Sequence, residues 1–106
     1  TNLTTKNIFA EVTGVVSGVT TIVGPYPALV NTKLLRVDVG GTNVAAYSIY
    51  IGGTLQAKKY TFYTILNEGF EFTDGLPVSL GDVIQVEVVH NRPDTGDFST
   101  NILIQN

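Results

Sequence analysis

The sequence predicts an all-β domain, an antiparallel β-sandwich of jelly-roll type with about eight strands. Val, Ile, Tyr, Phe and Thr dominate the apolar positions and often alternate with polar residues at a period of two. Glycine interrupts nearly every window of about twelve residues, so no segment keeps the periodicity of a helix. Turn residues recur at short intervals, which favours a sandwich, and a closed barrel is the alternative arrangement of the same strands.

The expected strands follow one another along the whole chain, separated by Gly, Pro, Asn and Asp. They lie at 8–16, 19–23, 33–39, 44–51, 58–66, 70–72, 83–90 and 98–105. We expect the first two to pair about a turn at Ser17-Gly18, and the last two to pair across loop 91–96. Pro25 and Pro27 stop the second strand, because proline cannot donate to a ladder.

Two of these strands indicate how the sheets are covered. In 33–39 the side chains of Leu35, Val37 and Val39 share one face, which we expect to lie on the core. In 58–66 both faces are partly apolar. That strand is therefore expected to be central in its sheet, or to have an outer face that another chain covers.

Composition narrows the classes of function. Only 14% of the residues are charged, the net charge is −3 and the basic residues are scattered, so nucleic-acid binding is disfavoured. The chain has no cysteine, which excludes disulfides and thiolate metal sites. No apolar run approaches the roughly 18 residues that cross a bilayer. We expect a polar N-terminal arm at 1–6 and a single domain at 7–106.

Residues that could carry catalysis are isolated in the sequence. The lone histidine, His90, ends a Val-rich strand, and we interpret it as a structural residue bonded to a loop carbonyl. Asp and Glu pairs could serve acid–base hydrolysis, but all lie in or beside turns, where such side chains commonly cap the backbone. These pairs are Glu68 with Glu71, Asp74 with Asp82, and Asp94 with Asp97. We therefore expect no enzyme activity and no cofactor.

The loop at 91–97 holds two further patterns. Asp94-Thr95-Gly96 resembles the catalytic triplet of aspartic proteases, but the flanking residues lack the small, apolar framework of that family, and we interpret it as a turn. Asn91, Asp94 and Asp97 offer hard oxygen ligands for calcium. Their spacing matches no EF-hand loop, and Arg92 lies among them, so we expect no resident metal.

The tyrosines are the best candidates for an interaction surface. Tyr47 and Tyr50 are three residues apart, as are Tyr60 and Tyr63, and residues three apart on a strand point to opposite faces. One member of each pair should therefore face outward, where tyrosine serves as a cross-strand packing partner, an interface anchor or a sugar-stacking platform. We take these four tyrosines, together with Leu3 of the arm, as candidate interface residues.

The segments 34–39, 47–51 and 76–88, the last with its Gly81-Asp82 turn, resemble small jelly-roll virion proteins of tailed bacteriophages. This resemblance implies a capsid decoration or cement protein, or part of a fibre, located in the virion. Its partners would be the major capsid protein or another virion protein, and its own copies. Similar Gly-Asp turns in tumour-necrosis-factor-like proteins favour a trimer by analogy. The alternative function is a carbohydrate- or receptor-binding module at a fibre or tail tip, using exposed tyrosines.

Overall fold

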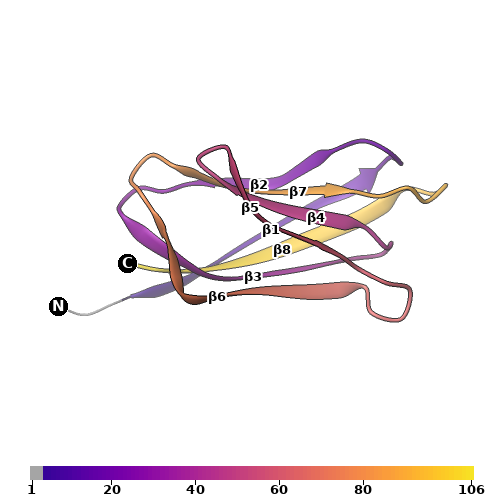
Figure 1. The fold of residues 1–106 in the computed structure, drawn as a ribbon. Coiled ribbons are helices and arrows are strands. Elements are labelled where there is room, and N and C mark those ends of the chain that lie inside the picture. The colour runs from indigo at the N-terminus through magenta and orange to yellow at the C-terminus, as the bar shows by residue number, and fades with distance from the viewer. Residues whose placement is uncertain (1–3) are drawn as a thin grey trace.

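The computed structural model describes residues 4–106, which form two antiparallel sheets packed face to face (Figure 1). No helix occurs among these residues, so nothing in this part of the chain forms a helix that could span a membrane. The strands are β1 (Thr5–Val15), β2 (Thr21–Pro27), β3 (Thr32–Gly41), β4 (Ala46–Ile51), β5 (Thr54–Tyr60), β6 (Asn67–Val78), β7 (Val83–Val89) and β8 (Gly96–Gln105).

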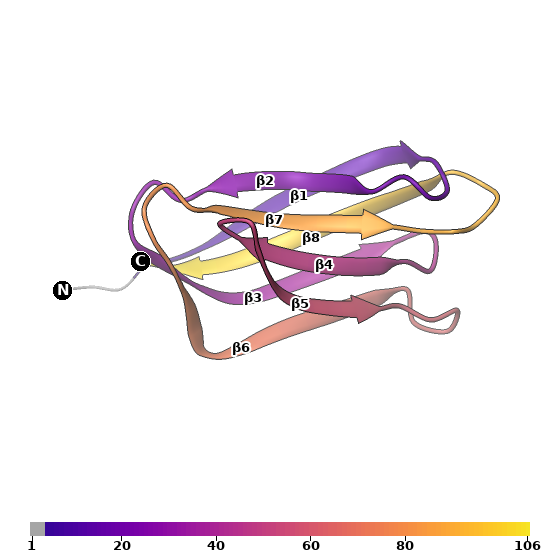
Figure 2. The same ribbon diagram turned by 45° about the horizontal axis from the view of Figure 1, so that its top comes forward.

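The strand orders are those of a jelly roll. One sheet has the order β1-β8-β3-β6 and the other β2-β7-β4-β5. The predicted sandwich is thus confirmed, and the closed barrel is not formed. Figure 2 shows β1 and β2 along one long side of the molecule and β5 and β6 along the other.

Strand pairing differs from the two expected hairpins. β1 pairs with β8 and β2 with β7, so the segments at 8–16 and 19–23 lie in opposite sheets. β7 and β8 are likewise in different sheets. The turn signals were located correctly, but each of these connections crosses from one sheet to the other instead of closing a hairpin.

The core consists of the inward-facing residues of both sheets. In β7 the alternation is regular, and Ile84, Val86 and Val88 are all fully buried. In β3 a bulge at Leu35 shifts the register, so the buried residues are Leu34, Val37 and Val39, and the expected inward position of Leu35 is wrong. A bulge inserts an unpaired residue and exchanges the two faces beyond it.

The expected strand at 58–66 ends early. β5 ends at Tyr60. The amide of Thr61 still donates to the carbonyl oxygen of Ala45, and Oγ1 of Thr61 accepts from the amide of Ala45, each over 2.9 Å. β5 is the last strand in the order of its sheet, so the expectation that this strand is central is wrong. β6 is longer than expected, running from residue 67 to 78 instead of 70–72.

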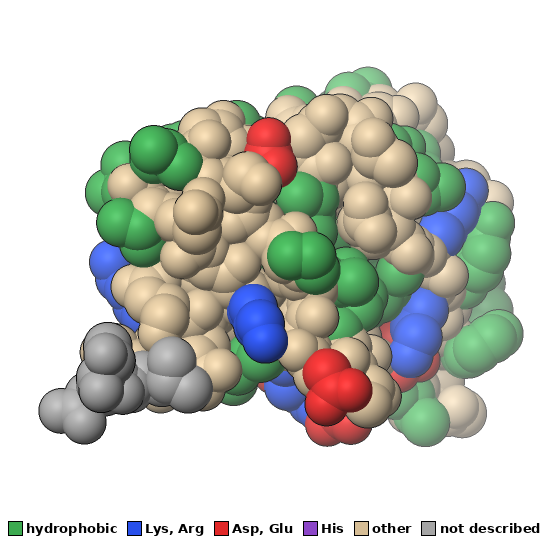
Figure 3. Space-filling view, turned by 60° about the vertical axis from the view of Figure 1, so that its left-hand side comes forward, with side chains coloured by type: hydrophobic (Ala, Val, Ile, Leu, Met, Phe, Trp, Pro, Cys, Tyr) green, Lys and Arg blue, Asp and Glu red, His purple; other side chains and the backbone are tan. Residues whose placement is uncertain are grey.

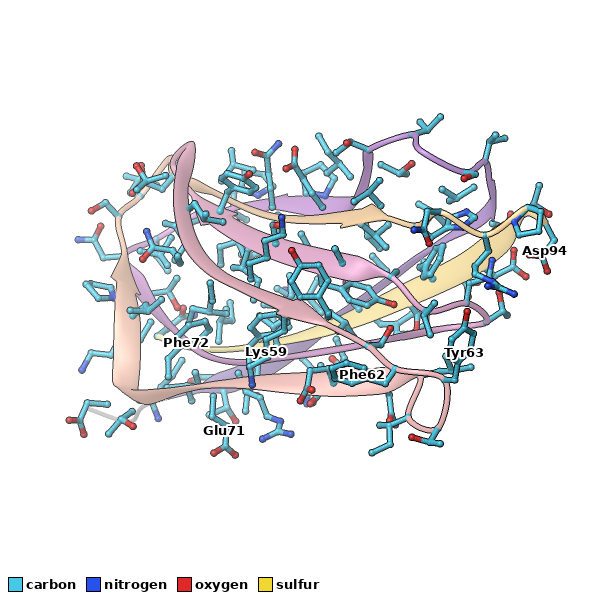
Figure 4. All side chains as sticks on the ribbon, turned by 45° about the vertical axis from the view of Figure 1, so that its right-hand side comes forward. Lys59, Phe62, Tyr63, Glu71, Phe72 and Asp94 are labelled. Atoms are coloured by element: carbon cyan, nitrogen blue, oxygen red, sulfur yellow. The ribbon has the colours of Figure 1, made fainter. Side chains whose placement is uncertain are left out.

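Lys59 joins the two sheets along their β5–β6 side. Its Nζ donates to the carbonyl oxygen of Gly69 over 2.8 Å and lies 3.8 Å from Glu68 Oε1. The same ammonium lies 5.4 Å from the centre of the Phe70 ring. A residue of β5 thus covers the edge of the core where β6 begins (Figure 4).

On the opposite side β1 and β2 approach closely at Gly24. This residue has a φ of +49°, and a Cβ placed on it would lie 2.2 Å from Cβ of Ala10. Only glycine fits here, because both the backbone conformation and the available space exclude a side chain. Gly24 therefore fixes how the edges of the two sheets meet.

The first strand includes part of the expected arm. Thr5 and Lys6 pair with Gln105 and Ile104, so the boundary between residues 6 and 7 is wrong and the domain begins earlier. These polar residues join the sheet through backbone hydrogen bonds, which do not depend on side-chain hydropathy. Residues 1–3, including the candidate Leu3, lie outside the described residues.

Candidate interaction surface

A short hairpin between β5 and β6 presents apolar side chains at one end of the sandwich. The amide of Phe62 donates to the carbonyl oxygen of Ile65 over 3.1 Å, and the amide of Ile65 donates back over 3.0 Å. This reciprocal pair closes a two-residue turn at Tyr63-Thr64. We refer to this segment as the 62–65 hairpin.

The side chain of Tyr63 is held in place by the neighbouring β7–β8 loop. Nη1 of Arg92 donates to the Tyr63 hydroxyl over 2.5 Å, and the guanidinium lies 5.2 Å from the centre of the tyrosine ring. Figure 4 shows Tyr63 directed from the hairpin toward that loop, while Phe62 projects along the open side between β5 and β6. The two rings therefore face different directions.

Four neighbouring residues make up the exposed apolar surface, which we call the hairpin surface. They are Tyr60, Phe62, Tyr63 and Ile65, with exposed fractions between 58% and 72%. Large aromatic side chains each offer about 200 Å² of surface, so this set exposes roughly 500 Å². This area is a sum over the hairpin, because the rings of Phe62 and Tyr63 face different directions (Figure 4).

A shallow hollow of about 290 Å³ borders this surface. Tyr60 forms one rim and Gly18 of the β1–β2 loop another, and Ala46 and Val89 contribute apolar side chains from the outer face of their sheet. His90 lies behind the hollow. It offers no free ring nitrogen there, as its hydrogen bonds show.

Both ring nitrogens of His90 are occupied. Nε2 lies 2.7 Å from the carbonyl oxygen of Val15 and must donate to it, since a carbonyl can only accept. Nδ1 accepts from the amide of Arg92 over 3.2 Å. The ring is buried and packs against Phe98 at a centroid distance of 5.5 Å. This arrangement suits a structural residue that ties β1 to the β7–β8 loop.

Four of the six candidate carboxylates are bonded to backbone amides or to cations, namely Glu68, Glu71, Asp82 and Asp97. Asp82 Oδ2 accepts from the amide of Ser79, and Asp97 Oδ1 accepts from the amide of Gly14. Glu71 forms an ion pair with Arg36. Within residues 4–106 there is no group of three or more His, Cys, Asp or Glu side chains that could hold a metal ion. Asp94 and Asp97 of the loop at 91–97 accordingly belong to no such group.

The tyrosine candidates are distributed as their spacing requires, with one correction. Tyr47 is fully buried, packs edge-on against Phe98 and offers no surface to a partner, while Tyr50 is half-buried on the outer face of its sheet. Tyr60 and Tyr63 are both exposed because the strand ends between them. Tyr47 is thus removed from the interface candidates.

Sequence reasoning missed Phe62 and Ile65 as surface residues. Both were assigned to a strand, in which alternate residues would face the core. The only signal was that both phases of 58–66 are apolar, which is more than one buried face requires. Elsewhere the surface carries few charges, and Figure 3 shows hydrophobic and polar side chains intermixed on the face near the termini.

No protein-family model, curated protein or solved structure matches the chain.

Proposed function

We propose that the chain is a non-enzymatic structural protein of a virion, a capsid decoration or cement protein. It docks on the major capsid protein, or on another virion protein, through the hairpin surface. The observation that carries the proposal is the 62–65 hairpin, whose apolar side chains are held outward by the fold.

The hairpin surface has the composition of an interface anchor. Aromatic residues are enriched at the centres of interfaces and charged residues are depleted there. The two backbone hydrogen bonds of the hairpin and the Arg92 contact to Tyr63 restrain these side chains before binding. Less conformational entropy is then lost when a partner covers them.

The exposed area is of a suitable size. A standard interface buries about 800 Å² on each partner, and the hairpin surface supplies roughly 500 Å² of apolar area. The remainder would come from the polar rim, which in this molecule is formed by loops of the same end. A strong site can therefore be built without rearranging the domain.

The virion role is supported by the jelly-roll strand order together with the Gly81-Asp82 turn that precedes β7. Both agree with the resemblance of 76–88 to small virion proteins of tailed bacteriophages. A domain used in many copies on a shell also benefits from short loops and from a chain without oxidisable Cys or Met.

The test is binding to capsids of the source virus. Phe62→Asp places a charge in the centre of the hairpin surface, and we expect at least a tenfold loss of affinity in co-sedimentation with shells lacking the protein. The matched control is Leu29→Asp, since Leu29 is equally exposed, at 73%, in the β2–β3 loop at the other end (Figure 1). Absence of the chain from purified virions, or wild-type binding by the Phe62 variant, would contradict the proposal.

A second candidate function is binding of a carbohydrate or receptor at a fibre or tail tip. Three exposed rings, those of Tyr60, Phe62 and Tyr63, lie within four residues of the chain, and each could stack on a sugar face. Glycan-array binding that is lost in Phe62→Asp, with no binding to capsids, would favour this function over the first.

A further inference from the structure

Three of the four sheet edges are protected against pairing with another chain. β2 contains Pro25 and Pro27 and a register shift. β5 is short, carries Lys58 and Lys59 and has a register shift in its pairing. In β6 residues 72–75 bulge out opposite a single residue of β3. Proline, lysine and bulges are the devices by which natural sheets prevent edge-to-edge association.

β1 is the edge with the fewest such devices, because its register shift lies at its end, between Val12 and Val15. It pairs regularly with β8 from residue 5 to residue 12 before any shift, and this stretch contains no proline and only one lysine, Lys6, near its start. Among the described residues β1 pairs with β8 alone. Phe9, in the middle of the stretch, is 64% exposed on the outer face of the sheet.

The hydrogen-bond pattern shows which residues of β1 face away from the sheet. The amide of Thr4 donates to the carbonyl oxygen of Asn106, and the amide of Asn106 donates to the carbonyl oxygen of Thr4, so these two residues form a hydrogen-bonded pair. In an antiparallel ladder such pairs alternate with pairs whose amides and carbonyls point outward. The outward-pointing backbone groups of β1 therefore belong to Thr5, Asn7, Phe9 and Glu11, which the register pairs with odd-numbered residues of β8.

We propose that two copies of the chain associate by antiparallel pairing of their β1 strands. This inference rests on the proposed function, a domain used in many copies on a shell, and names the surface through which two copies contact each other. The two sheets that contain β1 would join into one continuous sheet across a two-fold axis. Each copy has a single β1 edge, so the association closes at a dimer and does not continue into a fibre.

The register follows from symmetry. Two directly opposed residues must both have backbone groups that point outward, or both have backbone groups that point inward. Their residue numbers are therefore both odd or both even. It follows that at the two-fold axis one residue lies opposite the same residue of the second copy. Centring the pair on Phe9 brings the two exposed Phe9 rings together and overlaps residues 6 to 12, which all lie before the register shift. With two bonds for each hydrogen-bonded pair, this overlap forms about six backbone hydrogen bonds.

The side chains suit this register. Phe9 meets Phe9 of the second copy on the outer face, which gives a cross-strand aromatic pair. Glu11 lies opposite Asn7 of the second copy, and Lys6 opposite Val12, so no like charges face each other. A second copy is therefore complementary to β1 along residues 6 to 12.

A charge swap at the axis tests the proposal. Phe9→Asp and Phe9→Lys each bring two like charges together at the axis, and we expect both variants to be monomers in sedimentation-equilibrium experiments in which the wild type is a dimer. An equimolar mixture of the two should recover a one-to-one dimer. Circular dichroism should show folded variants, since the Phe9 side chain is largely exposed.

Cysteine cross-linking gives an independent readout, because the chain has no cysteine of its own. Phe9→Cys should form an intermolecular disulfide readily, as Cα atoms of a hydrogen-bonded pair are about 5.5 Å apart. The matched control is Asn101→Cys, which lies opposite Phe9 on β8 and is therefore one strand further from the axis. It should cross-link far more slowly.

Several results would overturn this inference. They are a monomeric or trimeric wild type, a dimer that persists in Phe9→Asp, no heterodimer in the mixture, or equal cross-linking of the two cysteine variants. Capsid binding is measured separately with Phe62→Asp. A chain that dimerises but ignores capsids refutes the virion role alone, and a capsid-binding monomer refutes the β1 pairing alone.

Discussion

Replacing Tyr47 by phenylalanine should stabilise the domain. Tyr47 is fully buried between the sheets, and its hydroxyl finds no hydrogen-bond partner among the described residues. An unpaired buried hydroxyl loses its bonds to water without compensation, at a cost of about 1–3 kcal/mol. The ring itself packs edge-on against Phe98, and phenylalanine keeps that contact.

The expected gain is about 1 kcal/mol in the free energy of unfolding, which is the lower end of that range. The gain is reduced because the surrounding residues can fill only part of the space that the hydroxyl leaves. For a domain of this size such a gain raises Tm by roughly 4 °C. Urea unfolding and a thermal scan measure the two quantities. Tyr50→Phe is the matched control: it removes a hydroxyl from the same strand at a half-buried site, and its effect should stay within about 0.5 kcal/mol.

The same burial predicts a pH dependence. Desolvation raises the pKa of Tyr47 above the ordinary value of about 10 for tyrosine. The unfolded chain then loses this proton at a lower pH than the folded chain, so the contribution of Tyr47 to stability is complete below pH 10 and is lost as pH rises further. The loss is about 1.4 kcal/mol per pH unit above 10, and it should be absent in Tyr47→Phe.

A destabilised Tyr47→Phe variant would refute this reasoning. A loss of 1 kcal/mol or more would mean that the hydroxyl makes a favourable hydrogen bond in solution. If wild type and Tyr47→Phe lost stability equally above pH 10, Tyr47 would ionise in the folded domain at the same pH as in the unfolded chain.

Three further substitutions test other parts of the fold by urea unfolding. Lys59→Met removes the bond to the Gly69 carbonyl and should lower the free energy of unfolding by about 0.5–1 kcal/mol. The difference between wild type and variant should be smaller at high salt. His90→Phe leaves two buried backbone groups without their ring-nitrogen partners and should cost about 2 kcal/mol; a neutral result would mean that His90 is free to act elsewhere. Gly24→Ala drives a methyl group into Ala10 at a positive φ and should cost about 3 kcal/mol, whereas a tolerated alanine would show that the β1–β2 edge is looser than described.

The local features of the fold could be predicted from the sequence, but the pairing of its strands could not. The alternation of apolar residues in β7 depends on neighbouring residues, and the turn at Gly81-Asp82 includes a local bond from the amide of Asp82 to the carbonyl oxygen of Ser79. Which strand lies beside which depends on residues far apart, as when β1 pairs with β8. In a jelly roll most consecutive strands enter opposite sheets, so the usual preference for pairing neighbours misleads.

The same division holds for the candidate surface. The spacing of Tyr47 and Tyr50 correctly requires them to face opposite ways, but the sequence does not show which one faces inward. Phe62 was assigned to a strand because the apolar residues continue past Tyr60, where β5 ends, and the amide of Ala45 is bonded to Oγ1 of Thr61, sixteen residues later in the chain. A contact of that kind leaves no mark in the local pattern.

The two proposed contacts lie on opposite sides of the sandwich. β1 is the first strand of its sheet order, and the 62–65 hairpin connects β5 and β6, the last strands of the two orders. Pairing through β1 would therefore leave both hairpin surfaces of a dimer uncovered. A dimer can then bind two sites on a shell at once, and its second binding event is intramolecular, with an effective concentration that raises the overall affinity. Phe9→Asp should consequently weaken capsid binding without touching the hairpin surface, while Phe62→Asp should leave the dimer intact.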